Sequence, residues 1–266
     1  MEFVELLNLI NLQEEVSLKV INLFNKNSDI YKDYIDNLIN INTSLETFVF
    51  LEEKYKEDKD NLNILCIYLL AALKTYQRYQ EKGISDIIFI DTMKCFTRFI
   101  DECYLKNNKY FFDRGFWTYR QVNMSLYRIG VLEYEFMNDN TISIHIPSDA
   151  ILTKENIDLS FKLLDEFIIK FYPEFIDKKI YCDTWLLSPN LREYLNDNSR
   201  ILIFQSYFEI SETDLDSLDI FEWVFKVDKS CEIVNLPTTT SLQEKLKKAL
   251  LNNKKIGKAL GILKKK

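Results

Sequence analysis

The side chain best suited to chemistry is the only histidine of the chain, His145. It lies in the run Ile-Ser-Ile-His-Ile, where apolar and polar residues alternate as in a strand with one buried face. An imidazole has an unperturbed pKa of about 6.5, which suits a general base working near neutral pH. A hydrogen-bonded core histidine would show the same pattern, so both interpretations stay open.

Four charged residues lie close to His145 in the sequence. Glu133 and Glu135 are two residues apart in an alternating run and therefore share one strand face. Two such carboxylates can deprotonate an amine or attract a cationic substrate, although a solvated strand face explains them equally well. Arg120 and Arg128 are suited to pairing with a phosphate or carboxylate of a substrate.

Strands and helices alternate in the part of the chain that must position these residues. Alternation over residues 117–146 predicts three strands, followed by a helix with Thr153 as its N-cap. Further strands are predicted at 179–187, 201–210 and 220–226, with a short helix at 188–195 and a basic helix from Ser241. Strands separated by helices pair in parallel and adjacent strands pair antiparallel, so we expect a mixed sheet.

The first part of the chain has the 3.6-residue periodicity of helices. A helix over about 60–81 is apolar on all sides in its middle and should be central, with Gly83 ending it. A second helix over about 86–106 has an apolar stripe typical of a core. We therefore predict an α+β protein with a helical N-terminal domain over 1–107 and a sheet domain with packed helices over 108–266.

Charge and composition exclude several classes of protein. Residues 241–266 contain nine lysines and one acid, which leaves a net charge of −15 on the remaining 240 residues. An acidic body repels nucleic acid, and the simplest role for the basic end is to fold back onto that body. With one histidine and no CxxC pair, the chain has few ligands for a structural zinc ion, so we expect no metal.

Location is predicted from the absence of targeting signals. The first residues lack the features of a signal peptide, and the longest apolar run is half of what a membrane span needs. The five cysteines are an odd number and are typical of free thiols in a reducing compartment. We expect a cytoplasmic protein that binds neither membrane nor nucleic acid; its oligomeric state is left open.

Short motifs over residues 117–242 carry a resemblance to a known family. They are Trp117-x-x-Arg120-Gln121, Arg128-x-Gly130-x-Leu132-x-Tyr134-Glu135, His145-Ile-Pro147-Ser148-Asp149-Ala150-x-Leu152, Cys182-x-x-Trp185-Leu186-Leu187-x-Pro189, Phe204-Gln205, Leu236-Pro237 and Thr240-Ser-Leu242. The chain resembles a bacterial two-domain acyltransferase-like family, with a helical acyltransferase N-terminal domain and a GNAT-like C-terminal domain.

The resemblance implies an acyl-CoA-dependent N-acyltransferase that uses acyl-CoA as cosubstrate and a small-molecule or peptide amine as acceptor. It implies that a base takes the amine proton, for which His145 is the first candidate and Glu135, within a family motif, the second. It also implies an acid for the leaving thiolate, and Tyr194 is near the expected place. Ser148 and Thr153 would contact the cosubstrate, whereas Arg120, Arg128 and Glu133 would contact the substrate.

The chain departs from the wider GNAT superfamily at the pyrophosphate loop. The expected glycines are absent from Pro147-Ser-Asp-Ala-Ile-Leu-Thr153, and Asp149 adds a negative charge there. This departure keeps a second hypothesis open, a non-catalytic binding module of the same fold that takes a cationic or peptide ligand.

Overall fold

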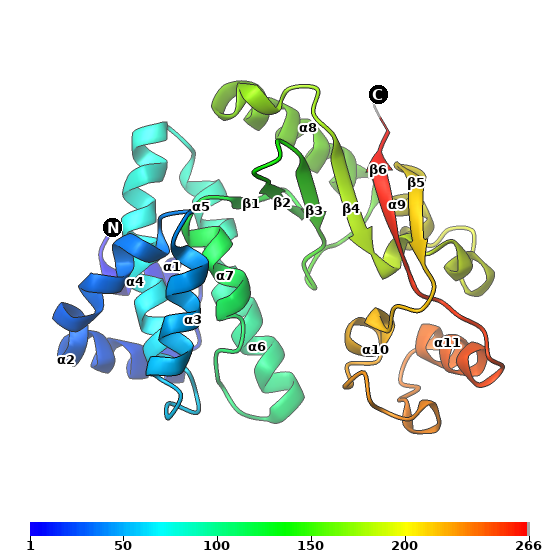
Figure 1. The fold of residues 1–266 in the computed structure, drawn as a ribbon, viewed down its shortest axis with the longest axis horizontal. Helices are drawn as coiled ribbons and strands as arrows, with labels where there is room; N and C mark the ends of the chain where they lie inside the picture. Colours follow the sequence, from blue (N-terminus) through cyan, green and yellow to red (C-terminus); the bar gives the residue numbers. More distant parts are fainter. Residues whose placement is uncertain (265–266) are drawn as a thin grey trace. The chain divides into compact units, whose positions relative to one another are not determined.

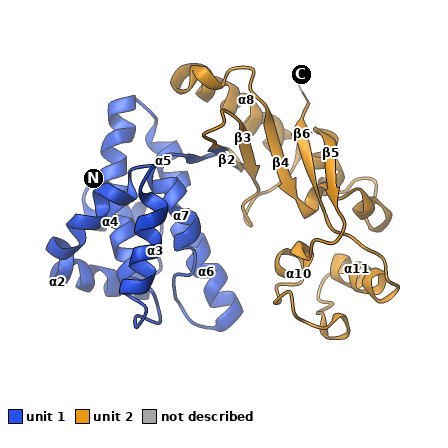
Figure 2. Cartoon of the chain, viewed as in Figure 1, with its two compact units in different colours: residues 1–129, 133–135 blue, residues 130–132, 136–266 orange. Residues whose placement is uncertain are grey.

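The structure, a computed structural model, describes residues 1–264 and divides into two compact units (Figure 2). Unit 1 comprises residues 1–129 and 133–135, and unit 2 comprises 130–132 and the described chain from residue 136 onward. The boundary between the units therefore lies at two places, in the turn between the first two strands of the sheet and within the second of these strands.

Unit 1 is mostly helical. Its elements are α1 (Phe3–Leu9), α2 (Glu14–Leu38), α3 (Ser44–Lys54), α4 (Leu62–Lys82), α5 (Asp86–Met93), α6 (Cys95–Asn107), α7 (Gly115–Val122), β1 (Leu126–Ile129) and most of β2 (Leu132–Phe136) (Figure 1).

The central helix of unit 1 is α4, as its apolar sequence predicts. Residues 64–72 are buried without interruption, because α4 packs against α2 and α7. Gly83 ends the helix in the left-handed conformation with φ +71°, as expected. The predicted stripe of the next helix is also buried, although Lys94 divides that helix into α5 and α6.

The first predicted strand is wrong, because residues 115–122 form the helix α7. The buried residues of α7, Thr118, Gln121 and Val122, recur at the spacing of a helix, whereas the five-residue alternation from Trp117 is too short to separate helix from strand. Because α7 packs on α3 and α4, this stretch lies within unit 1 although it follows residue 107. The domain boundary after residue 107 stays a prediction about independent folding.

Unit 2 contains the larger part of the sheet. Its elements are β3 (Ile142–His145), α8 (Lys154–Phe171), η1 (Pro173–Phe175), β4 (Ile180–Thr184), η2 (Trp185–Leu187), η3 (Pro189–Tyr194), α9 (Arg200–Ser206), β5 (Phe208–Asp214), α10 (Asp219–Trp223), η4 (Ile233–Asn235), α11 (Ser241–Leu251) and β6 (Lys258–Leu263), where η marks a 3₁₀-helix.

The strands follow the order β1-β2-β3-β4-β6-β5. β3 and β4 are parallel, whereas β6 is antiparallel to both β4 and β5. This mixed sheet with packed helices, preceded by a helical region, confirms the predicted α+β class.

Three of the later predicted strands are partly or wholly helical. The strand predicted at 179–187 ends as β4 at Thr184 and continues as the 3₁₀-helix η2. The run 201–210 divides at Tyr207 into α9 and β5, because the Ser199 hydroxyl accepts a hydrogen bond from the Ile201 N–H and begins a helix. The run 220–226 contains most of α10 and no strand; Ile220 and Phe221 of α10 and Phe225 after it enter a small core with α11. Short apolar runs fit either structure in sequence, and packing decides between them.

The basic end of the chain folds back, as expected for its described residues, but it is not only a helix. α11 begins at Ser241, as predicted, after a capping box of Thr240 and Gln243, and β6 then enters the sheet. Lys255 pairs with Asp216 and Lys258 pairs with Asp183, both acids of unit 2. Lys265 and Lys266 lie outside the described residues.

Candidate active site

The parallel strands β3 and β4 pair through their first residues. Ile142 lies opposite Ile180 and Ser143 lies opposite Tyr181, after which Ile144 and His145 extend past this paired part of β3. β4 meanwhile pairs with β6 from Tyr181 to Thr184. Ligands of open sheets bind outside the carboxyl ends of the strands. The region beyond the paired residues of β3 and β4, called the opening below, is therefore the first candidate site.

His145 is the last residue of β3 and is half-buried, so the fold places it at this opening. The loop that follows carries the exposed Ser148 and leads to Thr153. The Thr153 hydroxyl accepts a hydrogen bond from the Asn156 N–H and begins α8, as the sequence predicts. The roles of these three residues in binding or catalysis stay predictions.

A pocket of about 740 Å³ lies where α8 and the region of α9 meet. Its lining residues are Lys154, Asp158, Arg192, Asp197, Leu202, Ile203, Ser206 and Tyr207. The volume is in the range of small-molecule and cofactor sites. Because α8 follows β3 and α9 follows β4, the pocket belongs to the connections that leave the carboxyl ends of both strands.

One carboxylate in the pocket joins the two helical segments. Asp158 accepts a hydrogen bond from the Tyr207 hydroxyl at 2.8 Å and pairs with the Lys154 ammonium at 2.5 Å. Burial, and then the Asp158 carboxylate, raise the pKa of the Tyr207 phenol. The hydrogen bond to Asp158 likewise raises the pKa of the Lys154 ammonium.

Gln205 fixes α9 near the end of β4. Its side-chain amide donates to the carbonyl oxygens of Leu186 at 2.8 Å and Ser188 at 3.1 Å. The Ser188 hydroxyl donates to the carbonyl of Ile256, two residues before β6. These contacts give Ser188 and the motif residue Gln205 a part in positioning the pocket wall.

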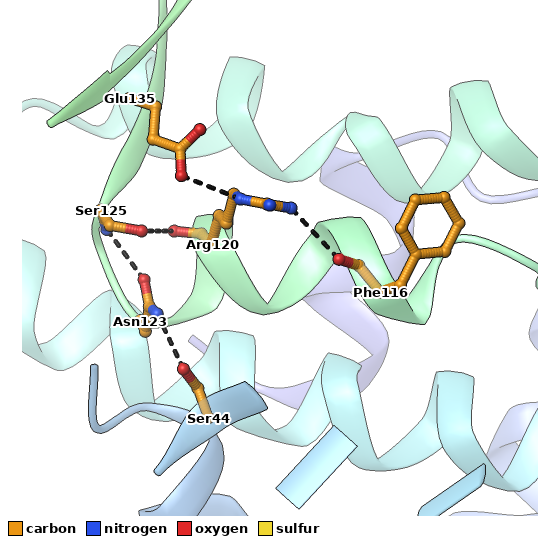
Figure 3. Close-up of polar contacts among 6 residues, drawn as sticks. All are labelled: Ser44, Phe116, Arg120, Asn123, Ser125 and Glu135. Atoms are coloured by element: carbon orange, nitrogen blue, oxygen red, sulfur yellow. Dashed lines mark hydrogen bonds and ion pairs between the residues drawn. The ribbon is translucent and has the colours of Figure 1, made fainter. Parts of the chain in front are cut away.

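Arg120 and Glu135, predicted separately as substrate-binding and catalytic residues, form an ion pair within unit 1. The Arg120 Nε donates to Glu135 Oε1 at 2.9 Å, and its Nη1 donates to the Phe116 carbonyl (Figure 3). The guanidinium also lies 4.6 Å from the centre of the Trp117 ring. The Tyr119 ring lies at 4.8 Å as well, so four groups contact the Arg120 guanidinium, three of them from its own helix.

Figure 3 shows the hydrogen bonds that connect α7 to neighbouring segments. The Ser125 hydroxyl donates to the Arg120 carbonyl, and the Ser125 N–H donates to Asn123 Oδ1. The Asn123 amide in turn donates to the Ser44 hydroxyl on α3 at 2.9 Å. The Arg120–Glu135 ion pair is thus connected to a series of polar contacts, most of which are buried.

Glu133 is the most buried of the predicted site residues. It pairs with Arg98 of α6 at 2.6 Å, and only 3% of the Glu133 side chain and 9% of the Arg98 side chain are exposed. The half-buried Arg128 lies on β1, where its backbone N–H donates to the Thr92 hydroxyl. The face shared by Glu133 and Glu135 therefore meets arginines, not bulk solvent.

Tyr194 ends η3 and is half-buried against the small core of α10 and α11. Burial raises the pKa of its phenol, with a smaller contribution from Glu193. Tyr194 is not among the residues that line the pocket, whereas Tyr207 is. Its role as the acid stays a prediction.

Sequence reasoning did not single out Lys154, Asp158, Arg192 or Tyr207. Lys154 and Asp158 have the i,i+4 spacing of an ordinary surface pair on a helix, and Tyr207 falls inside a run predicted as one strand. Only the meeting of α8 with α9 makes them one site.

Two further observations bound the chemistry of the described chain. Within residues 1–264, no group of three or more His, Cys, Asp and Glu side chains is arranged to hold a metal ion. None of the helices in the described part is both long and apolar enough to cross a bilayer.

Two protein families match successive parts of the chain. The family described as "N-acyltransferase N-terminal domain" matches residues 1–124, and the family described as "GNAT-like C-terminal domain" matches residues 126–263. No curated protein sequence matches the chain significantly.

Solved structures resemble it over nearly its whole length. One is an acyltransferase in complex with decanoyl-CoA and teicoplanin, with a TM-score of 0.81, 17% identity, and coverage of 97% of this chain and 86% of that one. Another is an acyltransferase in complex with CoA and 10C-teicoplanin, with a TM-score of 0.79, 17% identity, and coverage of 98% and 86%. At this identity the likeness shows the fold.

Together the two family matches account for almost all of the chain, and the second alone covers more than half of it. The chain therefore belongs to the family of acyltransferase-like proteins with a GNAT-like C-terminal domain, here preceded by an N-acyltransferase N-terminal domain.

Proposed function

We propose that the protein transfers an acyl group from acyl-CoA to an amine. The observation that carries the proposal is the opening beyond the paired residues of β3 and β4, with His145 at the end of β3 and a pocket of about 740 Å³ on the connections that follow. Membership of the GNAT-like family supports this assignment, as does the fold shared with acyltransferases bound to acyl-CoA.

The residues present fit such a ligand in size and partly in charge. The pocket volume suits a cofactor-sized molecule, and Lys154 and Arg192 supply cations that the glycine-free loop does not. Asp158 and Asp197 balance these charges. Phosphate recognition in this chain therefore depends on side chains, where the wider superfamily uses backbone N–H groups.

When bound, acyl-CoA supplies an activated thioester whose carbonyl carbon accepts the amine nitrogen. His145 would take the proton from the amine, since an alkylamine is mostly protonated at neutral pH and must lose a proton to attack. Glu135 is the second candidate base, although its Oε1 already accepts a hydrogen bond from Arg120. Tyr207 and Tyr194 are the candidate acids, and Tyr207 has the better support because it lines the pocket.

The acceptor is proposed to be a small-molecule or peptide amine. The net charge of −15 before Ser241 attracts a protonated amine over long range. One solved acyltransferase of this fold is named in complex with teicoplanin. Arg120, Arg128 and Glu133 remain the proposed substrate contacts of unit 1.

The rival proposal is a non-catalytic binding module for a cationic or peptide ligand. It is supported by the exposed Asp149 and the lack of glycine in the loop before α8. The two proposals differ in one respect, because only the enzyme must bind acyl-CoA.

A thermal-shift series with acyl-CoAs of increasing chain length tests the proposal. A ligand present at a hundred times its Kd adds about 2.7 kcal/mol to the free energy of unfolding and raises the melting temperature by several degrees. We expect a shift for at least one acyl-CoA. If no acyl-CoA shifts the melt but a cationic peptide does, the binding-module proposal replaces the enzyme.

We also propose that the protein works in a reducing compartment such as the cytoplasm. Its five cysteines are all free thiols, and four of them are buried. Retained stability after incubation with excess thiol reductant would be consistent with this location, whereas loss of the fold would contradict it.

A further inference from the structure

The exposure and the contacts of Asp158 are more than a purely structural residue needs. It is one-third exposed in the wall of the pocket, and it binds a lysine of its own helix and a tyrosine that follows α9. The Tyr207 contact joins the two segments. The contact with Asp158 draws the Lys154 ammonium toward the helix surface, although the Lys154 side chain is 65% exposed.

The pocket offers few other charges to an anionic ligand. Its charged lining consists of the cations Lys154 and Arg192 and the carboxylates Asp158 and Asp197. Any phosphate that enters must therefore approach a carboxylate, and it competes with Asp158 for the same ammonium. An exposed pair of this kind is held weakly, so a doubly charged phosphate can displace the carboxylate.

We propose that Asp158 is a positioning residue that holds Lys154 until a phosphate-bearing ligand takes the lysine, and that it thereby lowers the affinity of the pocket for anions. This inference rests on the proposed function for the identity of the ligand, CoA or an acyl-CoA. The anion site itself is tested independently of that identity.

Isothermal titration of CoA and of inorganic pyrophosphate into Asp158→Asn is the direct test. The amide keeps an acceptor for Tyr207, removes the negative charge and releases Lys154. We expect both ligands to bind about tenfold tighter than to the unmodified protein, the size of one screened charge interaction. Pantetheine, which lacks the phosphates, should bind both proteins equally.

A matched control lies two turns along the same helix. Glu166 pairs with Lys162 at the same i,i+4 spacing but does not line the pocket. Glu166→Gln makes the same change in net charge, so we expect no change in the affinity for pyrophosphate. An equal gain in this control would mean that overall charge, not Asp158, sets the affinity, and would overturn the inference.

Lys154→Gln gives a second test that does not depend on the stability of the Asp158 variant. Lys154 is mostly exposed, so its replacement should leave the fold intact while weakening pyrophosphate binding about tenfold. In the double variant the gain from Asp158→Asn should largely disappear, because the released lysine is its source. A gain that persists in full would overturn the inference.

The outcomes separate this inference from the proposed function. If pyrophosphate binding responds to Asp158→Asn but no CoA compound binds, the anion pocket stands and the acyltransferase proposal falls. If CoA binds and neither ligand responds to Asp158→Asn, the inference falls and the acyltransferase proposal stands. If nothing binds to any variant, both fall.

Discussion

Glu133 illustrates how a residue chosen for chemistry can be one that holds the fold. Breaking a buried ion pair by removing one charge costs about 3–5 kcal/mol, because the other charge remains buried without its partner. Glu133→Gln should therefore lower the free energy of unfolding by about that amount and leave Arg98 uncompensated. Denaturant unfolding measures this change.

Asp29→Asn is the control for that prediction, since Asp29 pairs with Lys32 where both side chains are largely exposed. Its effect on the free energy of unfolding should be far smaller, because solvent screens this exposed pair. If Glu133→Gln is as mild as this control but raises KM for the amine, Glu133 binds substrate as first predicted.

A second prediction concerns the reactivity of the individual cysteine thiols. Burial raises the pKa of the Cys66 and Cys103 thiols to about 12, and it raises the pKa of Cys95 and Cys182 further. Thiolates are the reactive form, so these four should be inert in the folded protein. A disulfide reagent should titrate the half-exposed Cys231 alone, and all five after unfolding. Rapid reaction of a second thiol without denaturant would contradict this burial.

At the scale of elements, the last strand is where sequence reasoning failed and where the structure makes a sharp prediction. Gly257 precedes β6 with φ +66°, and a Cβ there would lie 2.2 Å from the Asp214 carbonyl oxygen. Gly257→Ala should therefore strain the backbone and disturb the pairing of β6 with β5. We expect a loss of about 2–4 kcal/mol in the free energy of unfolding.

Gly83→Ala separates the two causes of that loss. Gly83 has φ +71° but no atom within 4 Å of an added Cβ, so only the cost of the left-handed conformation, about 1–2 kcal/mol, applies. Equal melting temperatures for the two variants would show that the close approach at Gly257 is unimportant.

The elements also show what periodicity can and cannot predict. α4 and α8 were predictable because each is long enough for its apolar pattern to repeat several times. α7, α9 and α10 span only five to eight residues, where alternation and helical spacing coincide. β6 was hidden in a lysine-rich segment, because the sheet position that makes it a strand is set by contacts with β4 and β5.

The candidate site was predictable to a similar degree. The position of His145 in a strand followed from alternation, although the strand ends at His145 and does not continue past it, and the start of α8 at Thr153 followed from capping chemistry. The pocket did not follow, since Lys154 and Asp158 come from α8, Arg192 from η3 and Tyr207 from the residue after α9. Sequence spacing carries no information about which of these three segments meet.

At the scale of the whole molecule, the division into units bears on how the chain folds. α7 lies beyond residue 107 yet buries Val122 and Thr118 in unit 1, where it packs on α3 and α4. A fragment of residues 108–266 should therefore expose this apolar face and be poorly soluble. A soluble fragment with a sharp thermal transition would contradict the prediction and support the boundary after residue 107.

His145→Ala tests the chemistry of the proposed acyl transfer. If His145 is the base, kcat should fall about 10²–10⁴-fold while the affinity for acyl-CoA stays nearly unchanged. The melting temperature of the variant must be close to that of the parent for this comparison. A variant that melts lower but turns over normally would show that His145 is structural, and Glu135 would be tested next.

The most direct measurement is the loss of thioester from decanoyl-CoA, followed by chromatography with and without a panel of small-molecule and peptide amines. Proton removal and thiolate departure both depend on the acceptor, so we expect a loss that requires an amine, with a matching gain of one decanoyl group in the mass of that amine. An acyl-CoA that neither binds to the folded protein nor loses its acyl group to any amine would contradict this expectation.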